Sequence, residues 1–168
     1  HLFGIPTTIF RFFTVYGPWG RPDMALFKFT KAILSGQSID IYNYGNMNRD
    51  FTYILDLVHA INLLIDIVPI KPNKRKSIIK NDSISETAPY RIVNIGNEKP
   101  TNLMNYIEEL EIALGIVSNK NFIEMQDGDL KETYSNTMLL KTLTGFSAKK
   151  PLKEGILEFV NWYKSYYK

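Results

Sequence analysis

The stretch RFFTVYGPWGRPDM, residues 11–24, joins a predicted strand to a stiff and positively charged turn. The strand is predicted over residues 7–13, TTIFRFF, because β-branched and aromatic residues predominate there. Pro6 precedes this run, and the turn around Gly17 and Pro18 follows it. The chain therefore opens with a strand that leads into a turn of restricted backbone.

Arg21 is the candidate anion-binding residue of this turn, because it lies between Gly20 and Pro22. Proline disfavours helical geometry for the residue before it, so the backbone of Arg21 is constrained. A guanidinium held in this way loses little entropy when it pairs with a carboxylate or a phosphate. The alternative is a surface arginine that stacks on Trp19.

Strands and helices alternate along the rest of the chain, and no internal repeat occurs. Asp23 is predicted to cap the first helix. Helices are predicted over residues 24–34, 55–68, 101–114 and 137–143 and from 151 onward, and strands over 38–44, 49–54, 90–96 and 121–125. Residues 71–89 are charged and interrupted by prolines, which predicts a flexible surface loop. The class is α/β or α+β.

The composition excludes several kinds of protein. The net charge of +3 is far from that of a nucleic-acid-binding domain, and the basic run at 71–80 has no stacking platform beside it. There is no cysteine, and the histidines are His1 and His59 alone, so no metal site is predicted. No apolar run reaches the roughly 18–20 residues of a membrane span. A cytoplasmic protein without a membrane or nucleic-acid partner is expected.

Further candidate ligand-binding residues each have an ordinary alternative. Arg49 begins a strand and is suited to phosphate, but a strand-edge arginine next to an acidic residue such as Asp50 usually forms a local ion pair. Lys28 lies near the start of a helix, where anions are favoured, although most such lysines are only solvated. Asp129 follows Gly128 in a tight turn. Its carboxylate can accept hydrogen bonds from the hydroxyl groups of a sugar, or it can cap the next segment.

Aromatic and histidine side chains in the middle of the chain are equally open to two interpretations. Tyr42 and Tyr44, on a predicted strand, fit either a flat ligand ring or the protein core. His59, in the middle of a predicted helix, is interpreted as a half-buried structural residue.

The sequence contains no recognisable catalytic set. No glycine trio with dinucleotide-binding spacing occurs, and no tyrosine is followed by a lysine four positions later. Neither a Ser/His/Asp set nor a carboxylate pair is organised. The residues indicate anion binding without a catalytic group.

Motifs in a fixed order resemble the nucleotide-sugar epimerases of the extended short-chain dehydrogenase/reductase family, above all the UDP-glucuronate 4-epimerases of capsule biosynthesis. These motifs are IPTTIFRFFTVYGPWGRPDMA (5–25), RDFTYILDLV (49–58), NIGN (94–97) and QDGD (126–129). The resemblance covers the whole chain except residues 71–89. It implies an α/β fold in which an N-terminal Rossmann domain binds NAD and a smaller C-terminal domain binds the nucleotide sugar.

The resemblance implies that residues 1–168 are the C-terminal substrate-binding region, with the last Rossmann strands attached and the N-terminal NAD-binding half absent. The family's Tyr-x-x-x-Lys pair lies in that other half, so the chain is expected to be inactive alone and not to bind NAD by itself. Its expected partners are a UDP-sugar and either the missing half or a second copy. Because a Rossmann strand is normally covered on both sides, a missing half would leave apolar surface exposed on residues 7–13.

The resemblance also implies roles for individual residues. Tyr16 and Pro18 match positions that line the nicotinamide pocket. The matched substrate-binding positions are Thr14, Arg21, Lys28, Ile41, Tyr42, Arg49 and Asp129.

Among these positions, Arg49 matches the pyrophosphate-binding arginine and Asp129 the acidic residue that holds the uridine ribose. Arg21 lies near the sugar, while Ile41 and Tyr42 border the uracil. Two alternatives are a stand-alone or vestigial nucleotide-sugar-binding domain, and a dehydratase or decarboxylase of the same family.

Overall fold

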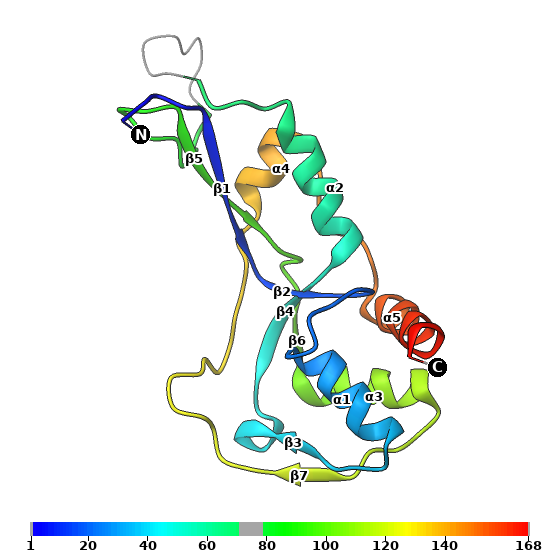
Figure 1. The fold of residues 1–168 in the computed structure, drawn as a ribbon. Helices are drawn as coiled ribbons and strands as arrows, with labels where there is room; N and C mark the ends of the chain where they lie inside the picture. Colours follow the sequence, from blue (N-terminus) through cyan, green and yellow to red (C-terminus); the bar gives the residue numbers. More distant parts are fainter. Residues whose placement is uncertain (1, 71–78, 168) are drawn as a thin grey trace.

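The computed structural model describes residues 2–70 and 79–167 as an α/β fold (Figure 1). The strands are β1 (Thr7–Phe12), β2 (Thr14–Tyr16), β3 (Ile39–Ile41), β4 (Asn48–Tyr53), β5 (Tyr90–Ile95), β6 (Pro100–Asn102) and β7 (Lys120–Phe122). The helices are α1 (Ala25–Leu34), α2 (Ile54–Ile65), α3 (Leu103–Leu114), α4 (Met138–Thr144) and α5 (Leu152–Tyr166), with a short 3₁₀ turn at Tyr42–Gly45.

The strands form small sheets that follow one another along the molecule. β1 pairs with β5 in parallel at one end, and β3 pairs with β7 in parallel at the other. Between them, β4 pairs in parallel with β2 and antiparallel with β6. Figure 1 shows α2 and α4 beside the β1–β5 pair, and α1, α3 and α5 near the other sheets.

The larger core lies among α1, α3 and α5. Each of these helices places apolar residues three or four positions apart on one face, as in Ile107, Leu110 and Leu114 of α3. Phe159 of α5 and Phe27 of α1 pack edge to face in this core, with ring centroids 6.4 Å apart. This packing holds the strands that carry the candidate site.

The second core packs α2 and α4 against β1 and β5, through residues such as Leu64 and Val93. On β1, Ile9 and Phe12 keep 41% and 49% of their surface exposed. Exposed apolar surface is therefore present on the strand where it was expected. Among the described residues, no helix is long and apolar enough to cross a membrane.

Several element boundaries differ from those predicted. The predicted strand at 38–44 ends at Ile41, because Asn43 and Tyr44 adopt left-handed φ angles of 49° and 51° and turn the chain. Residues Pro100–Asn102 form a strand against β4 before α3 begins, with the Asn102 side chain accepting a hydrogen bond from the Met104 N–H at 2.8 Å. Neither the turn at Asn43 and Tyr44 nor the pairing of residues 100–102 with β4 is visible in local sequence preferences.

The predicted cap of α1 is also wrong. Met24 precedes the helix and no side chain caps it, while the Asp23 carboxylate bonds to Arg21. Asp23 therefore contributes to the turn and not to the helix end.

The predicted flexible loop at 71–89 is only partly described, since residues 71–78 lie outside the described part of the chain. Asp82 forms a buried ion pair with Arg91 of β5, with Nε and Oδ1 2.9 Å apart. Arg91 also donates to the Ile67 carbonyl at 3.3 Å. These bonds attach the Asp82 region to β5 and to the segment after α2.

Candidate functional site

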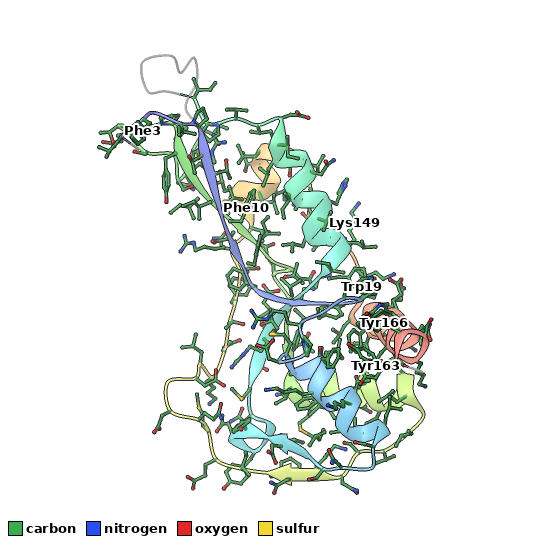
Figure 2. All side chains as sticks on the ribbon, in the orientation of Figure 1. Phe3, Phe10, Trp19, Lys149, Tyr163 and Tyr166 are labelled. Carbon is green, nitrogen blue, oxygen red and sulfur yellow. The ribbon has the colours of Figure 1, made fainter. Side chains whose placement is uncertain are left out.

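The turn after β2 approaches α2 so closely that only glycine fits. Gly17 has a φ of +131°, and a Cβ added there would lie 2.6 Å from Ile54 Cγ2. Trp19 adopts a left-handed φ of 63° and packs against Trp162 and Tyr166 of α5, with centroid distances of 5.3 and 5.0 Å (Figure 2). Trp19 thus packs on aromatic side chains of α5, whereas the sequence left open that Arg21 stacks on it.

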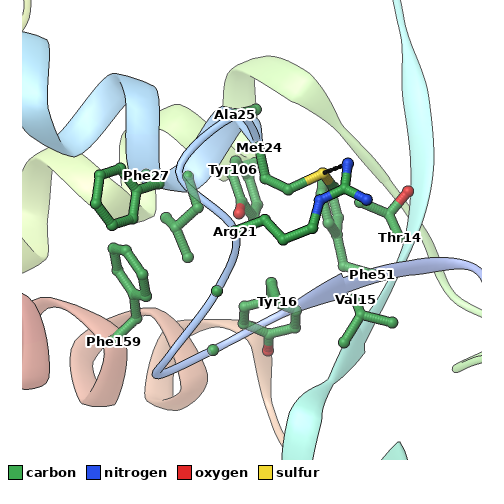
Figure 3. Close-up of a pocket in the computed structure, with 13 residues that line it drawn as sticks. Thr14, Val15, Tyr16, Arg21, Met24, Ala25, Phe27, Phe51, Tyr106 and Phe159 are labelled. Carbon is green, nitrogen blue, oxygen red and sulfur yellow. Dashed lines mark hydrogen bonds between the residues drawn. The ribbon is translucent and has the colours of Figure 1, made fainter.

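A small cavity of about 40 Å³ lies between β2, this turn and α1 (Figure 3). The rings of Phe51 and Tyr106 stack beside it at 4.1 Å, and Thr14 and Met24 also line it. A larger open hollow of about 540 Å³ lies next to it; Tyr16 and Arg21 line both, and the lining of the hollow is mainly apolar. The arrangement offers aromatic walls with one cation at the opening.

Arg21 supplies that cation. Its Nε and Nη2 donate to the two oxygens of Asp23 at 2.9 and 2.7 Å, and Nη2 approaches Met24 Sδ at 3.8 Å (Figure 3). The hydrogen bond from Arg21 lowers the pKa of the Asp23 carboxyl. Both side chains are exposed, so the pair fixes the direction of the guanidinium more than it adds stability.

Tyr16 contributes its ring but directs its hydroxyl elsewhere. The side chain is 5% exposed, and its oxygen lies 2.5 Å from where a Cβ on Gly155 of α5 would be. Burial raises the pKa of Tyr16 far above its usual value, so the phenol stays neutral. Pro18 lines only the larger hollow.

Arg49 and Asp129 meet although 80 positions separate them in the sequence. The Arg49 Nη2 donates to Asp129 Oδ1 at 2.8 Å, and Nη1 donates to the Asn48 carbonyl at 3.0 Å. The Asp129 carboxylate also accepts the Leu130 N–H at 2.7 Å. The acidic residue therefore both caps its own turn and faces the arginine.

The remaining predicted site residues lie in different surroundings. Lys28 is exposed on α1, and Tyr42 is half-buried in the 3₁₀ turn. Ile41 is completely buried in the larger core, so it offers a ligand no side-chain surface. His59 is exposed and packs its ring edge to face on Phe146, which corrects its interpretation as half-buried.

Two groups of residues at the site were missed from the sequence. Phe51, Tyr106 and Phe159 line the small cavity, but an aromatic residue in an apolar pattern predicts core and nothing more. Asp50 does not pair with Arg49, because neighbouring strand residues point to opposite faces. Asp50 is completely buried and bonds to other segments. Over residues 2–70 and 79–167, no group of His, Asp and Glu side chains could hold a metal ion.

The chain is similar to known proteins along its whole length. Residues 1–76 match the model of the NAD dependent epimerase/dehydratase family. The whole chain is 51% identical to half of Protein CapI from Staphylococcus aureus, and 48% identical to 49% of a probable UDP-glucuronate 4-epimerase from Rhizobium meliloti. The chain thus spans about half the length of these relatives.

A solved structure gives the same match. The UDP-glucuronic acid 4-epimerase of Bacillus cereus, in complex with UDP-glucuronic acid and NAD, superposes with a TM-score of 0.78 and 28% identity. The match covers 96% of this chain and 46% of that protein. Residues 1–76 thus match the NAD dependent epimerase/dehydratase family, and the chain is similar, along its whole length, to about half of a UDP-glucuronate 4-epimerase.

Proposed function

We propose that this chain is the nucleotide-sugar-binding part of an NAD-dependent UDP-glucuronate 4-epimerase that serves capsule or cell-surface polysaccharide biosynthesis. The observation that carries the proposal is the Arg49–Asp129 pair, a cation and a carboxylate 2.8 Å apart. A guanidinium suits the anionic diphosphate of a nucleoside diphosphate, and a carboxylate suits the hydroxyl donors of its ribose. The relatives named as UDP-glucuronate 4-epimerases support the same ligand.

In this proposal each of the two residues binds a different part of the nucleotide. Arg49 donates to the diphosphate, and its planar guanidinium suits the paired oxygens of that group. Asp129 accepts hydrogen bonds from the ribose hydroxyls through its carboxylate. Both side chains retain exposed surface, 18% for Arg49 and 37% for Asp129, so a ligand can reach them.

The sugar end of the ligand is assigned to the larger hollow beside β2, since the neighbouring small cavity of about 40 Å³ has no room for a sugar ring. Arg21 would pair there with the glucuronate carboxylate, since its guanidinium already holds a carboxylate in a bidentate arrangement. Thr14 adds a hydroxyl to the lining of the small cavity.

The residues of this chain fit only one part of NAD. The larger hollow, lined by Phe13, Pro18 and the Tyr16 ring, offers an apolar wall to a nicotinamide. No Gly-x-Gly-x-x-Gly loop is present in the sequence for the dinucleotide phosphates. When bound, NAD supplies reversible hydride transfer at the sugar.

The chain by itself is expected to bind the nucleotide sugar without epimerising it, because its sequence has no Tyr-x-x-x-Lys pair. A Rossmann half, from the same protein or from another chain, would have to supply that pair. The exposed Ile9 and Phe12 on β1 are consistent with such a contact. A cytoplasmic location and the absence of a nucleic-acid partner remain predictions.

Calorimetric titration of the chain with UDP-glucuronate, and separately with UDP, tests the proposal. Heat of binding with both ligands is expected, with the tighter affinity for UDP-glucuronate. A folded sample that gives no heat with either ligand would overturn the binding role. Epimerisation by the chain alone after addition of NAD would instead overturn the expectation that it is inactive.

A further inference from the structure

Asp50 is a buried carboxylate that joins separate segments of the chain. Its side chain accepts hydrogen bonds from the Asn97 N–H at 2.9 Å, the Glu98 N–H at 3.0 Å and the Ser135 N–H at 3.0 Å. The Ser135 hydroxyl donates to it as well. These donors offset the cost of burying the charge.

One of these segments, residues 129–135, lies along β4 and carries Asp129. The Asn48 N–H donates to the Lys131 carbonyl at 3.0 Å, and the Thr133 N–H donates back to the Asn48 carbonyl at 3.1 Å. The Asp50 N–H then donates to the Thr133 hydroxyl at 3.2 Å. The segment is thus bonded to Asn48 and Asp50 of β4, and the last of these bonds joins Ser135 to the Asp50 carboxylate.

Arg49 and Asp50 hold this segment from opposite faces of the strand. Arg49 bonds to Asp129 at the exposed end, and Asp50 bonds to Ser135 at the buried end. Gly96 allows the close approach at the buried end, because a Cβ there would lie 2.2 Å from Ser135 Oγ. The segment that carries Asp129 is therefore held by backbone bonds to Asn48 and, at its buried end, by the Asp50 carboxylate.

We propose that Asp50 is a positioning residue for nucleotide recognition: it fixes residues 129–135 so that Asp129 stands beside Arg49. This role rests on the proposed function, since it assumes that Arg49 and Asp129 bind a nucleoside diphosphate. Asp50 itself is buried and does not touch the ligand.

The test compares two ligands that differ only at the ribose. Asp50→Asn keeps the size of the side chain but removes its charge and turns one acceptor into a donor. The affinity of this variant for UDP is expected to fall at least about tenfold. 2′,3′-Dideoxy-UDP, which offers Asp129 no hydroxyl group, is expected to lose less than about threefold. Asp66→Asn, with the same charge change on an exposed residue, is the matched control.

Hydrogen exchange supplies a readout that does not need the ligand. In Asp50→Asn, the Thr133 and Ser135 amides should exchange faster while the amides of α5 keep their rates. If Asp50→Asn does not fold, Ser135→Ala removes one donor to the same carboxylate and should give the same ligand pattern with a smaller change.

Each outcome supports or overturns a distinct claim. Equal losses of affinity for both ligands in a folded variant, or an unchanged affinity for UDP, would overturn the role of Asp50 but leave the proposed function standing. Failure of the unaltered chain to bind UDP would overturn the proposed function and this role with it.

Discussion

At the scale of single residues, the site depends on charges that the fold brings together from distant positions. Arg49 and Asp129 were each open to an ordinary interpretation in the sequence, and the structure pairs them at 2.8 Å. Arg21 was expected to bind an anion and is already bonded to one, the Asp23 carboxylate. A ligand carboxylate would therefore have to replace Asp23 or share the guanidinium with it.

Arg21 is predicted to set the preference for an acidic sugar. Arg21→Gln should leave the affinity for UDP-glucose nearly unchanged and weaken UDP-glucuronate by about tenfold, because one charge-assisted hydrogen-bond pair is lost. The ratio of the two affinities by calorimetry measures this effect. An unchanged ratio would place the sugar carboxylate elsewhere.

At the scale of elements, α5 is attached to β4 by a polar cluster. The Tyr53 hydroxyl donates to Glu158, which also accepts from Lys150 Nζ at 2.5 Å. The same lysine lies 5.6 Å from the centroid of the Tyr53 ring. Burial, followed by the bond to Glu158, raises the pKa of Tyr53 to about 12. The cluster thus favours the neutral phenol and joins the C-terminal helix to the strand that carries Arg49.

The raised pKa of Tyr53 predicts a pH dependence of stability. The neutral phenol is favoured in the folded state, so its contribution is complete below about pH 10 and is lost as the pH rises toward 12. Tyr53→Phe should lower the free energy of unfolding by about 1 kcal/mol at pH 8. Denaturant unfolding of both proteins between pH 8 and 12 should show this difference shrinking. A constant difference would contradict the assignment.

The ion pair of Asp82 and Arg91 is the second contact between elements that can be tested. Asp82→Ala leaves Arg91 buried without its partner and should cost about 3 kcal/mol of unfolding free energy. The double variant Asp82→Leu with Arg91→Met removes both charges and should be more stable than Asp82→Ala. Chemical denaturation measures both. A double variant less stable than Asp82→Ala would show that the charges themselves are needed.

The helices could be predicted from the sequence better than the short strands. The apolar periodicity of α3 and α5 is local, so it is visible in the residues themselves. Strands β2 and β6 are three residues long each, and both are defined by pairing with β4. Pairing of this kind depends on distant residues, and so do the bonds of Asp50 to residues 97, 98 and 135.

At the scale of the whole molecule, the chain combines the Arg49–Asp129 pair with a strand that keeps apolar surface exposed. The motifs in the sequence predicted the family, and the comparisons confirm the resemblance over about half of the relatives' length. The roles of individual site residues stay predictions. The central claim is that Arg49 and Asp129 form a nucleoside-diphosphate site.

The most direct test of that claim is a titration of UDP into the unaltered chain, Arg49→Gln and Lys149→Gln. Lys149→Gln makes the same charge change on a residue outside the site and serves as the control. We predict that Arg49→Gln binds UDP at least tenfold more weakly than the unaltered chain, while Lys149→Gln binds with unchanged affinity. Equal affinities for UDP in all three folded proteins would contradict the account.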